Sequence, residues 1–229
     1  MFIPDEILRT LLRLYGGLFG RAEISGYFPL PKGPKIIAAN HTLASDAFHL
    51  PLVLDEKPYF MMQHNLFDLP LFGPLLKLAG QIPVERNGTR ATDCLSHAYG
   101  VLAEGKTIVI FPEGELVPPG KRIRAKTGVV HMALEAGVPI IPLGMYVAPQ
   151  NVMKFSTRWQ GCNRSGLWQV SGKCLLNFGA PWRPSLLKRS PAAIHALTDE
   201  LMNHIYSLVA QSERESRCVS HTSLNPILR

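Results

Sequence analysis

The sequence lacks several features that define whole classes of protein. It contains only 4 cysteines, and none stands in a Cys-x-x-Cys pair, so we predict neither a zinc site nor a disulfide framework and expect a reducing compartment. No apolar run approaches the roughly 20 residues that a membrane-spanning helix needs. The N-terminal segment does not follow the pattern of a cleavable signal peptide, because Arg9 and Arg13 interrupt its apolar stretch.

Common catalytic and binding signatures are also missing. There is no Gly-x-Ser-x-Gly elbow to expose a serine nucleophile, and the histidines other than His41 share no spacing with carboxylates that would indicate a metal. The 3 tryptophans do not interleave with basic residues as a base-stacking platform would. Residues 100–107 match the phosphate-loop pattern, but a helix is predicted before them and a strand after them, which is the reverse of what that loop needs.

Charge is the clearest compositional feature that is present. The chain of 229 residues has 24 basic and 17 acidic side chains, a net charge of +7. This balance favours an anionic partner: membrane phospholipid, a phosphorylated small molecule or nucleic acid. The length suits one domain with a full core, or a domain with a small appendage.

Strand and helix patterns alternate through the middle of the chain. Such alternation, with nearly continuous apolar strands, predicts an α/β fold in which a mixed, largely parallel sheet is covered by helices on both faces. Residues 149–166 are predicted to form a loop, 167–178 a last strand or hairpin, and 194–208 an amphipathic helix. The predicted strands are 34–39, 58–62, 80–86, 106–111 and 138–143, and the predicted helices follow Asp46 and cover 66–79, 89–104 and 127–136.

The two ends of the chain differ from the middle. Residues 3–19 place apolar side chains at three- and four-residue spacings and leave Arg9 and Arg13 off that stripe, which predicts an amphipathic helix. Its stripe could pack on the core or lie in a membrane interface. We therefore divide the chain into an N-terminal helix at 1–20, a domain at 21–211 and a polar tail at 212–229 that we predict to be disordered.

The strongest candidate for chemistry is the pair His41 and Asp46, which directly follows an apolar strand. On one continuous helix a five-residue offset turns two side chains about 140° apart, so the pair can meet only if His41 precedes the helix. Thr42 or Ser45 would then cap that helix with a hydroxyl. His41 would act as a general base and Asp46 would orient its ring. The alternative is a capping pair without chemistry.

A second candidate follows the strand at 106–111. Glu113 and Gly114 come directly after it, which suits a site where backbone approaches a ligand. Four basic residues follow closely: Lys121, Arg122, Arg124 and Lys126. An ordinary turn with a solvated run of charge is the alternative.

Four blocks, taken in order, resemble the motifs of the glycerolipid acyltransferases, and in particular the bacterial 1-acylglycerol-3-phosphate acyltransferases. They are residues 40–46, 80–86, 111–114 and 138–142. The resemblance implies transfer of a fatty acyl group from a coenzyme A or acyl-carrier-protein thioester to a lysophospholipid hydroxyl, without a metal or other cofactor. It makes His41 the base and Asp46 its partner, gives Arg86 the acceptor's phosphate, and lets Glu113 and Gly114 shape the acceptor site.

One departure leaves the acceptor open. Members of the family commonly continue Glu-Gly with Thr-Arg-Ser, whereas here Glu115 and Leu116 follow. A carboxylate about 4 Å from a phosphate would cost roughly 1 to 4 kcal/mol at dielectric constants of about 80 to 20. The acceptor is therefore expected to be lysophosphatidate or, alternatively, a non-phosphate alcohol or amine.

The resemblance also bears on location. It favours a membrane-interface role for the N-terminal helix, and so a protein held at the cytoplasmic face of a membrane as a peripheral or monotopic enzyme, with membrane lipid and not nucleic acid as its partner. The rival from another class is a non-catalytic lipid-binding module, which would keep the basic surface but would not need a base paired with a carboxylate.

Overall fold

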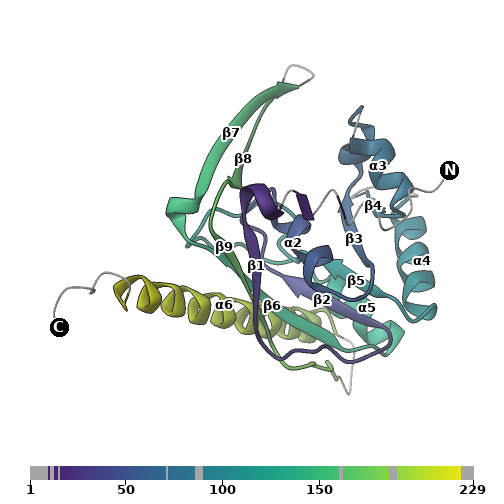
Figure 1. Ribbon diagram of the computed structural model, residues 1–229. Helices are drawn as coiled ribbons and strands as arrows, with labels where there is room; N and C mark the ends of the chain where they lie inside the picture. Colours follow the sequence, from purple (N-terminus) through teal and green to yellow (C-terminus); the bar gives the residue numbers. More distant parts are fainter. Residues whose placement is uncertain are drawn as a thin grey trace, which may run out of the picture.

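The computed structural model describes residues 10, 13–14, 16–70, 72–85, 90–159, 162–185 and 190–222. In this part of the chain, one sheet has seven strands in the order β1-β9-β6-β2-β5-β3-β4, and a second sheet pairs β7 with β8 (Figure 1). The strands are Arg21–Gly26 (β1), Lys35–Ala39 (β2), Pro58–Gln63 (β3), Ile82–Val84 (β4), Thr107–Ile110 (β5), Ile140–Val147 (β6), Val152–Trp159 (β7), Cys162–Gln169 (β8) and Lys173–Phe178 (β9).

The seven-stranded sheet is mixed and largely parallel, as predicted. Its neighbouring strands pair in parallel except β6 and β9, which are antiparallel. The helices are Asp46–Val53 (α2), Phe72–Leu78 (α3), Arg90–Ala103 (α4), Gly128–Ala136 (α5) and Pro191–Thr222 (α6), with 3-10 turns at His64–Asp68 and Pro149–Asn151.

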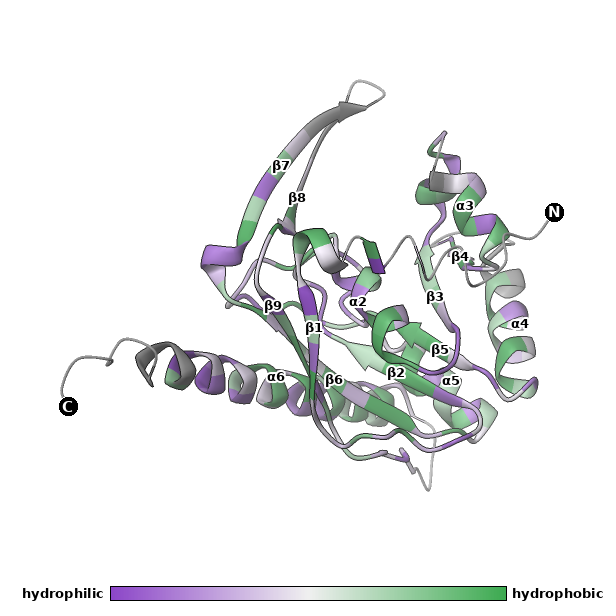
Figure 2. Ribbon diagram, in the orientation of Figure 1, coloured by the Kyte–Doolittle hydropathy of each residue, from purple (hydrophilic) through white to green (hydrophobic). Residues whose placement is uncertain are grey.

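The side-chain alternation of β2 shows why both faces of the sheet are covered. Ile36 and Ala38 join a core cluster with α4, α5 and α6, whereas Ile37 and Ala39 join a second cluster with α2 on the opposite face. All four side chains are fully buried, because successive residues of a strand point to opposite faces. After their first residues, Lys35 and Thr107, the central strands β2 and β5 are hydrophobic (Figure 2), which is the pattern expected of strands covered on both sides.

Two predictions for the second half of the chain are wrong. The segment 149–166, expected to be a loop, forms β7 and most of β8, a hairpin paired along its whole length. The tail expected to be disordered from residue 212 continues α6 as far as Thr222. Its polar composition was misleading because Ser212 is fully buried, and because Arg217 bonds Glu213 one turn earlier. Residues 223–229 lie outside the described residues.

The predicted N-terminal helix also lies largely outside them. Residues 16–19 are helical, and the described apolar side chains Leu14, Leu18 and Phe19 are exposed. The boundaries at 20 and 21 and the interfacial role of this helix stay predictions. Among the described residues, no helix combines the length and the hydropathy that crossing a bilayer requires.

At Gly144 the backbone of β6 lies close to the backbone of α6, and this contact yields a stability prediction. A methyl group at Gly144 would lie 2.5 Å from the Val209 nitrogen and 2.7 Å from the Leu208 carbonyl carbon, both backbone atoms of α6. We expect Gly144→Ala to lower the free energy of unfolding by roughly 1 to 3 kcal/mol, as overpacking does. Gly100→Ala in α4 is the control: it meets nothing within 4 Å and should stabilise the helix by roughly 0.5 to 1 kcal/mol. Urea denaturation of both variants decides, and equal effects would contradict the close packing of α6.

Candidate active site

The turn between β2 and α2 brings His41 and Asp46 together. Helix α2 begins at Asp46, so His41 precedes it, and His41 Nδ1 lies 3.1 Å from Asp46 Oδ2. The same oxygen accepts the backbone N–H groups of Thr42 at 2.9 Å and Leu43 at 2.8 Å. The predicted geometry is therefore confirmed, and Asp46 has two tasks: it closes the turn and it orients the histidine ring.

The expected hydroxyl cap is wrong. Neither Thr42 nor Ser45 caps α2 through its side chain. Ser45 Oγ instead accepts the Gln169 N–H at 3.2 Å, which ties the turn to β8. The Asp46 carboxylate takes the turn's amides because an ionised acceptor forms stronger hydrogen bonds than a neutral hydroxyl does.

The His41 ring is held on both its edge and its face. It stacks on Phe111, with ring centroids 4.1 Å apart and planes 13° apart, and its side chain is 21% exposed. Since Nδ1 faces Asp46, the other ring nitrogen is the one that can exchange a proton with a ligand. Within the described part of the chain Nε2 has no hydrogen-bond partner.

Glu113 fixes the backbone of this turn through a hydrogen bond. Its Oε2 accepts the His41 N–H at 2.5 Å and its Oε1 accepts the Tyr206 hydroxyl at 2.8 Å. Burial raises the pKa of the Glu113 carboxyl, and the two donated hydrogen bonds counter part of that rise. Burial, and then the bond to Glu113, raises the pKa of the Tyr206 hydroxyl. Glu113 is 2% exposed, so any influence on an acceptor would act through the position of His41.

Gly114 turns the chain away from the sheet edge. Its φ of 71° lies in the left-handed region, its N–H donates to the Phe111 carbonyl, and its own carbonyl accepts Gln63 Nε2 at 3.0 Å. The loop that follows starts and ends beside the site, because Val117 N–H donates to the His41 carbonyl at 2.8 Å and Lys126 N–H to that of Pro112 at 2.7 Å. The exposed side chains of Lys121, Arg122 and Arg124 lie on this loop.

Some site residues were not predicted, and one predicted residue cannot be placed. Tyr206 was not predicted, because no local sequence signal marks its bond to Glu113. The guanidinium of Arg122, one of the basic residues named from the sequence, lies 4.5 Å from the Tyr206 ring centroid. Phe111 could have been found from its position next to Glu113 and its fit as a stacking face for a histidine. Arg86 lies outside the described residues, so its expected role stays a prediction.

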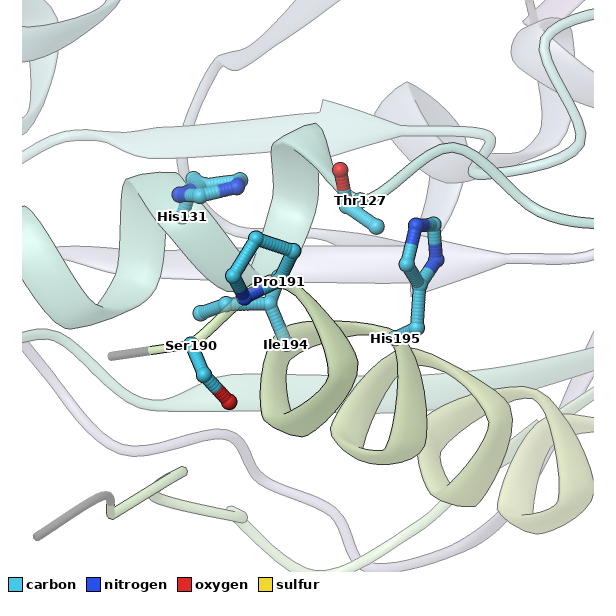
Figure 3. Close-up of a pocket in the computed structure, with 6 residues that line it drawn as sticks. All are labelled: Thr127, His131, Ser190, Pro191, Ile194 and His195. Carbon is cyan, nitrogen blue, oxygen red and sulfur yellow. The ribbon is translucent and has the colours of Figure 1, made fainter. Parts of the chain in front are cut away.

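A separate hollow on the α5–α6 side does not form part of this site. It has a volume of about 270 Å³ and is lined by Thr127, His131, Ser190, Pro191, Ile194 and His195. Figure 3 shows its two histidines on opposite sides of Pro191 and the Ser190 hydroxyl directed away from both, so its polar groups do not converge on one point. Among the described residues, no three His, Cys, Asp or Glu side chains are grouped to hold a metal.

The raised pKa of Glu113 gives the second prediction. Its ordinary value is 4.5 and folding raises it, so between about pH 4.5 and the raised value the folded protein binds more protons than the unfolded chain. Stability supplied by the protonated form is therefore lost as pH rises through this window. Glu113→Gln should remove this decline in the free energy of unfolding. The decline amounts to about 1.4 kcal/mol for each tenfold difference in proton affinity between the folded and the unfolded state. Denaturation curves of wild type and variant at several pH values measure this difference. The other groups that face residue 113, namely His41, Asp46 and Tyr206, are the same in both proteins, so their effect cancels in the comparison. A wild-type-to-variant difference that does not change with pH would contradict the prediction.

Comparison with known proteins found relatives that are named as acyltransferases. A Brassica napus protein named 1-acyl-sn-glycerol-3-phosphate acyltransferase BAT2, chloroplastic, is 28% identical over 128 residues, which are 55% of this chain and 37% of that protein. The human 1-acyl-sn-glycerol-3-phosphate acyltransferase alpha is 31% identical over 217 residues, covering 93% and 72% of the two chains. The chain thus spans little more than a third of the plant relative's length.

The fold has a solved counterpart. The crystal structure of the 1-acyl-sn-glycerophosphate acyltransferase PlsC from Thermotoga maritima matches with a TM-score of 0.64, at 18% identity, over 91% of this chain and 81% of that one. The sequence model of the Acyltransferase family matches residues 21–146, which include His41, Asp46, Glu113 and Gly114. Because that match extends over more than half of its 229 residues, the chain belongs to the Acyltransferase family.

Proposed function

We propose that the protein transfers a fatty acyl group from a coenzyme A or acyl-carrier-protein thioester to the free hydroxyl of 1-acylglycerol-3-phosphate, in phospholipid synthesis. The observation that carries the proposal is the His41–Asp46 pair, in which Nδ1 meets a buried carboxylate. The other ring nitrogen is left to serve as a base at the carboxyl edge of the sheet. The names of the relatives support the choice of acceptor.

The reaction needs one base and no covalent enzyme intermediate. His41 Nε2 takes the proton of the acceptor hydroxyl as the hydroxyl oxygen attacks the thioester carbonyl carbon. The carbon–sulfur bond then breaks, the new ester remains on the acceptor, and the departing thiolate takes the proton from the imidazolium. Asp46 stabilises that imidazolium through Nδ1 and keeps the ring in place, as the carboxylate does in a catalytic triad.

Acceptor charge is the finer part of the proposal. The exposed Lys121, Arg122 and Arg124, on a loop bonded at both ends to the site, favour an anionic acceptor. Glu115, also exposed, favours the alternative of a non-phosphate alcohol or amine. A non-catalytic lipid-binding module would account for the cations but not for a base oriented by a buried carboxylate. We place the enzyme at the cytoplasmic face of a membrane, as a peripheral or monotopic protein.

Removing the base is the direct test. His41→Ala should lower turnover by roughly 100- to 10,000-fold, the usual contribution of general-base catalysis. Its melting temperature should stay near that of wild type, because Asp46 keeps both backbone hydrogen bonds of the turn. Asp46→Asn should lose nearly as much activity, since the imidazolium loses its charged partner. His131→Ala, an exposed histidine of the separate hollow, is the matched control. A folded His41→Ala protein with near-normal turnover would rule out the mechanism.

The acceptor is tested at Arg86. If it holds a phosphate, its planar fork makes two charge-assisted bonds that lysine cannot reproduce. Arg86→Lys should then raise KM for lysophosphatidate, and not for the thioester, by about 10- to 150-fold, which corresponds to roughly 1.5 to 3 kcal/mol. Glu115→Thr combined with Leu116→Arg should lower KM for lysophosphatidate and leave an uncharged monoacylglycerol unaffected. A wild-type preference for the monoacylglycerol, with no effect of Arg86→Lys, would favour the alternative acceptor.

A further inference from the structure

The β7–β8 hairpin stands away from the main sheet, and its two strands pair only with each other among the described strands (Figure 1). Met153, Lys154, Phe155 and Ser156 are all exposed, so both faces of β7 are open along this stretch. Met153 is 52% exposed and Phe155 is 50% exposed, and hydrophobic and hydrophilic segments alternate along β7 (Figure 2). An isolated hairpin is at best marginally stable in water, so this one is suited to a partner.

The base of the hairpin is hydrogen-bonded to the turn that carries His41. Ala44 N–H donates to the Leu167 carbonyl at 2.8 Å. A methyl group on Gly166 would lie 3.3 Å from Ala44 Cβ and 3.6 Å from Leu116 Cδ1. Gly166 pairs with Phe155 and therefore shares its face of the hairpin. An apolar path thus runs from Phe155 past Gly166 and Leu116 to the turn that carries His41.

Other exposed apolar residues lie on segments that meet this base. The helical turn before β1 lies beside the base of β8 in Figure 1, and a side chain on Gly20 would collide with Gln169, the last residue of β8. That turn and the residues before it expose Leu14, Leu18 and Phe19, and the loop after Gly114 exposes Leu116. With Met153 and Phe155, these make six of the ten large apolar side chains that are exposed in the described part of the chain. Exposed apolar side chains on adjoining segments are typical of an interaction surface.

The charge around this surface identifies the occupant. The sequence contains no acidic residue between Glu135 and Asp199, whereas β7 and β8 contain Lys154, Arg158 and Arg164. Lys154 is exposed between Met153 and Phe155 and has no carboxylate partner among the described residues. Exposed apolar side chains interspersed with cations match the interface of an anionic bilayer, in which the apolar groups enter the acyl boundary and the cations meet phosphates.

We propose that the hairpin inserts Met153 and Phe155 into an anionic bilayer and so holds the open side of the His41 site against the membrane. The inference rests on the proposed function for the lipid acceptor, and it adds a contact distinct from the predicted N-terminal helix. Lipid therefore reaches the site along the hairpin, while Lys154 and the exposed cations of the 115–126 loop bind headgroups.

The test compares vesicle binding of full-length variants by co-sedimentation. Met153→Ser combined with Phe155→Ser should lower the partition coefficient onto phosphatidylglycerol–phosphatidylcholine vesicles by roughly tenfold, which corresponds to about 1.4 kcal/mol of lost apolar burial. Leu95→Ser is the matched control, because Leu95 is 39% exposed on α4, away from the hairpin. Lys154→Glu should weaken binding to these vesicles and not to pure phosphatidylcholine. Unchanged binding of the double variant, or an equal loss in Leu95→Ser, would overturn the proposal.

An activity measurement separates the bilayer from a single acyl chain as the occupant. With a short-chain lysophosphatidate in free solution the double variant should turn over at the wild-type rate, whereas with long-chain acceptor in vesicles its rate should fall with its binding. A loss on the soluble acceptor with unchanged vesicle binding would overturn the bilayer assignment in favour of a substrate-chain site. A wild-type protein inactive on both acceptors would refute the proposed function and leave the binding result valid.

Discussion

A single buried carboxylate oxygen organises the start of α2 and the candidate base together. Asp46 Oδ2 accepts the Thr42 and Leu43 amides and faces His41 Nδ1, and Asp46 is 2% exposed. Burying a charge is costly unless it is hydrogen-bonded, and these donors are what makes an ionised group tolerable here. The same bonds restrict the turn. The hydrogen bonds that satisfy the backbone amides also fix the carboxylate that orients the His41 ring. Structure and proposed chemistry therefore depend on one group.

A second buried carboxylate extends this constraint across the molecule. Glu113, three residues after β5, is bonded to the His41 amide and to the hydroxyl of Tyr206 on α6. Helix α6 in turn packs so closely on β6 that a side chain at Gly144 would meet its backbone. The position of His41 thus depends on a helix that begins well beyond the last recognisable motif. The helix continues through a polar stretch because that stretch also packs on the domain, where Ser212 is buried.

The features that could be predicted from the sequence are those that a local residue pattern encodes. Continuous apolar runs identified the central strands, and the five-residue offset required His41 to precede α2, as it does. The cap was mispredicted because Asp46 and the hydroxyls compete for the same amides, and only three-dimensional geometry decides among them. The Glu113–Tyr206 bond joins residues 93 positions apart, so no local pattern reveals it. The β7–β8 hairpin was missed because a strand that buries few side chains lacks the apolar run that marks a core strand.

The proposed docking surface also bears on a chemical difficulty of the site. A base that can activate a lipid hydroxyl can also activate water, and water would hydrolyse the thioester. His41 is 21% exposed and Phe111 covers one face of its ring, so part of the ring stays open to solvent. The base of the hairpin and the loop carrying Leu116 are both bonded to the turn that carries His41. A bilayer held there would replace water with lipid, which lowers the local dielectric and strengthens the His41–Asp46 interaction. The apolar hairpin would therefore serve selectivity for a lipid hydroxyl over water as well as attachment.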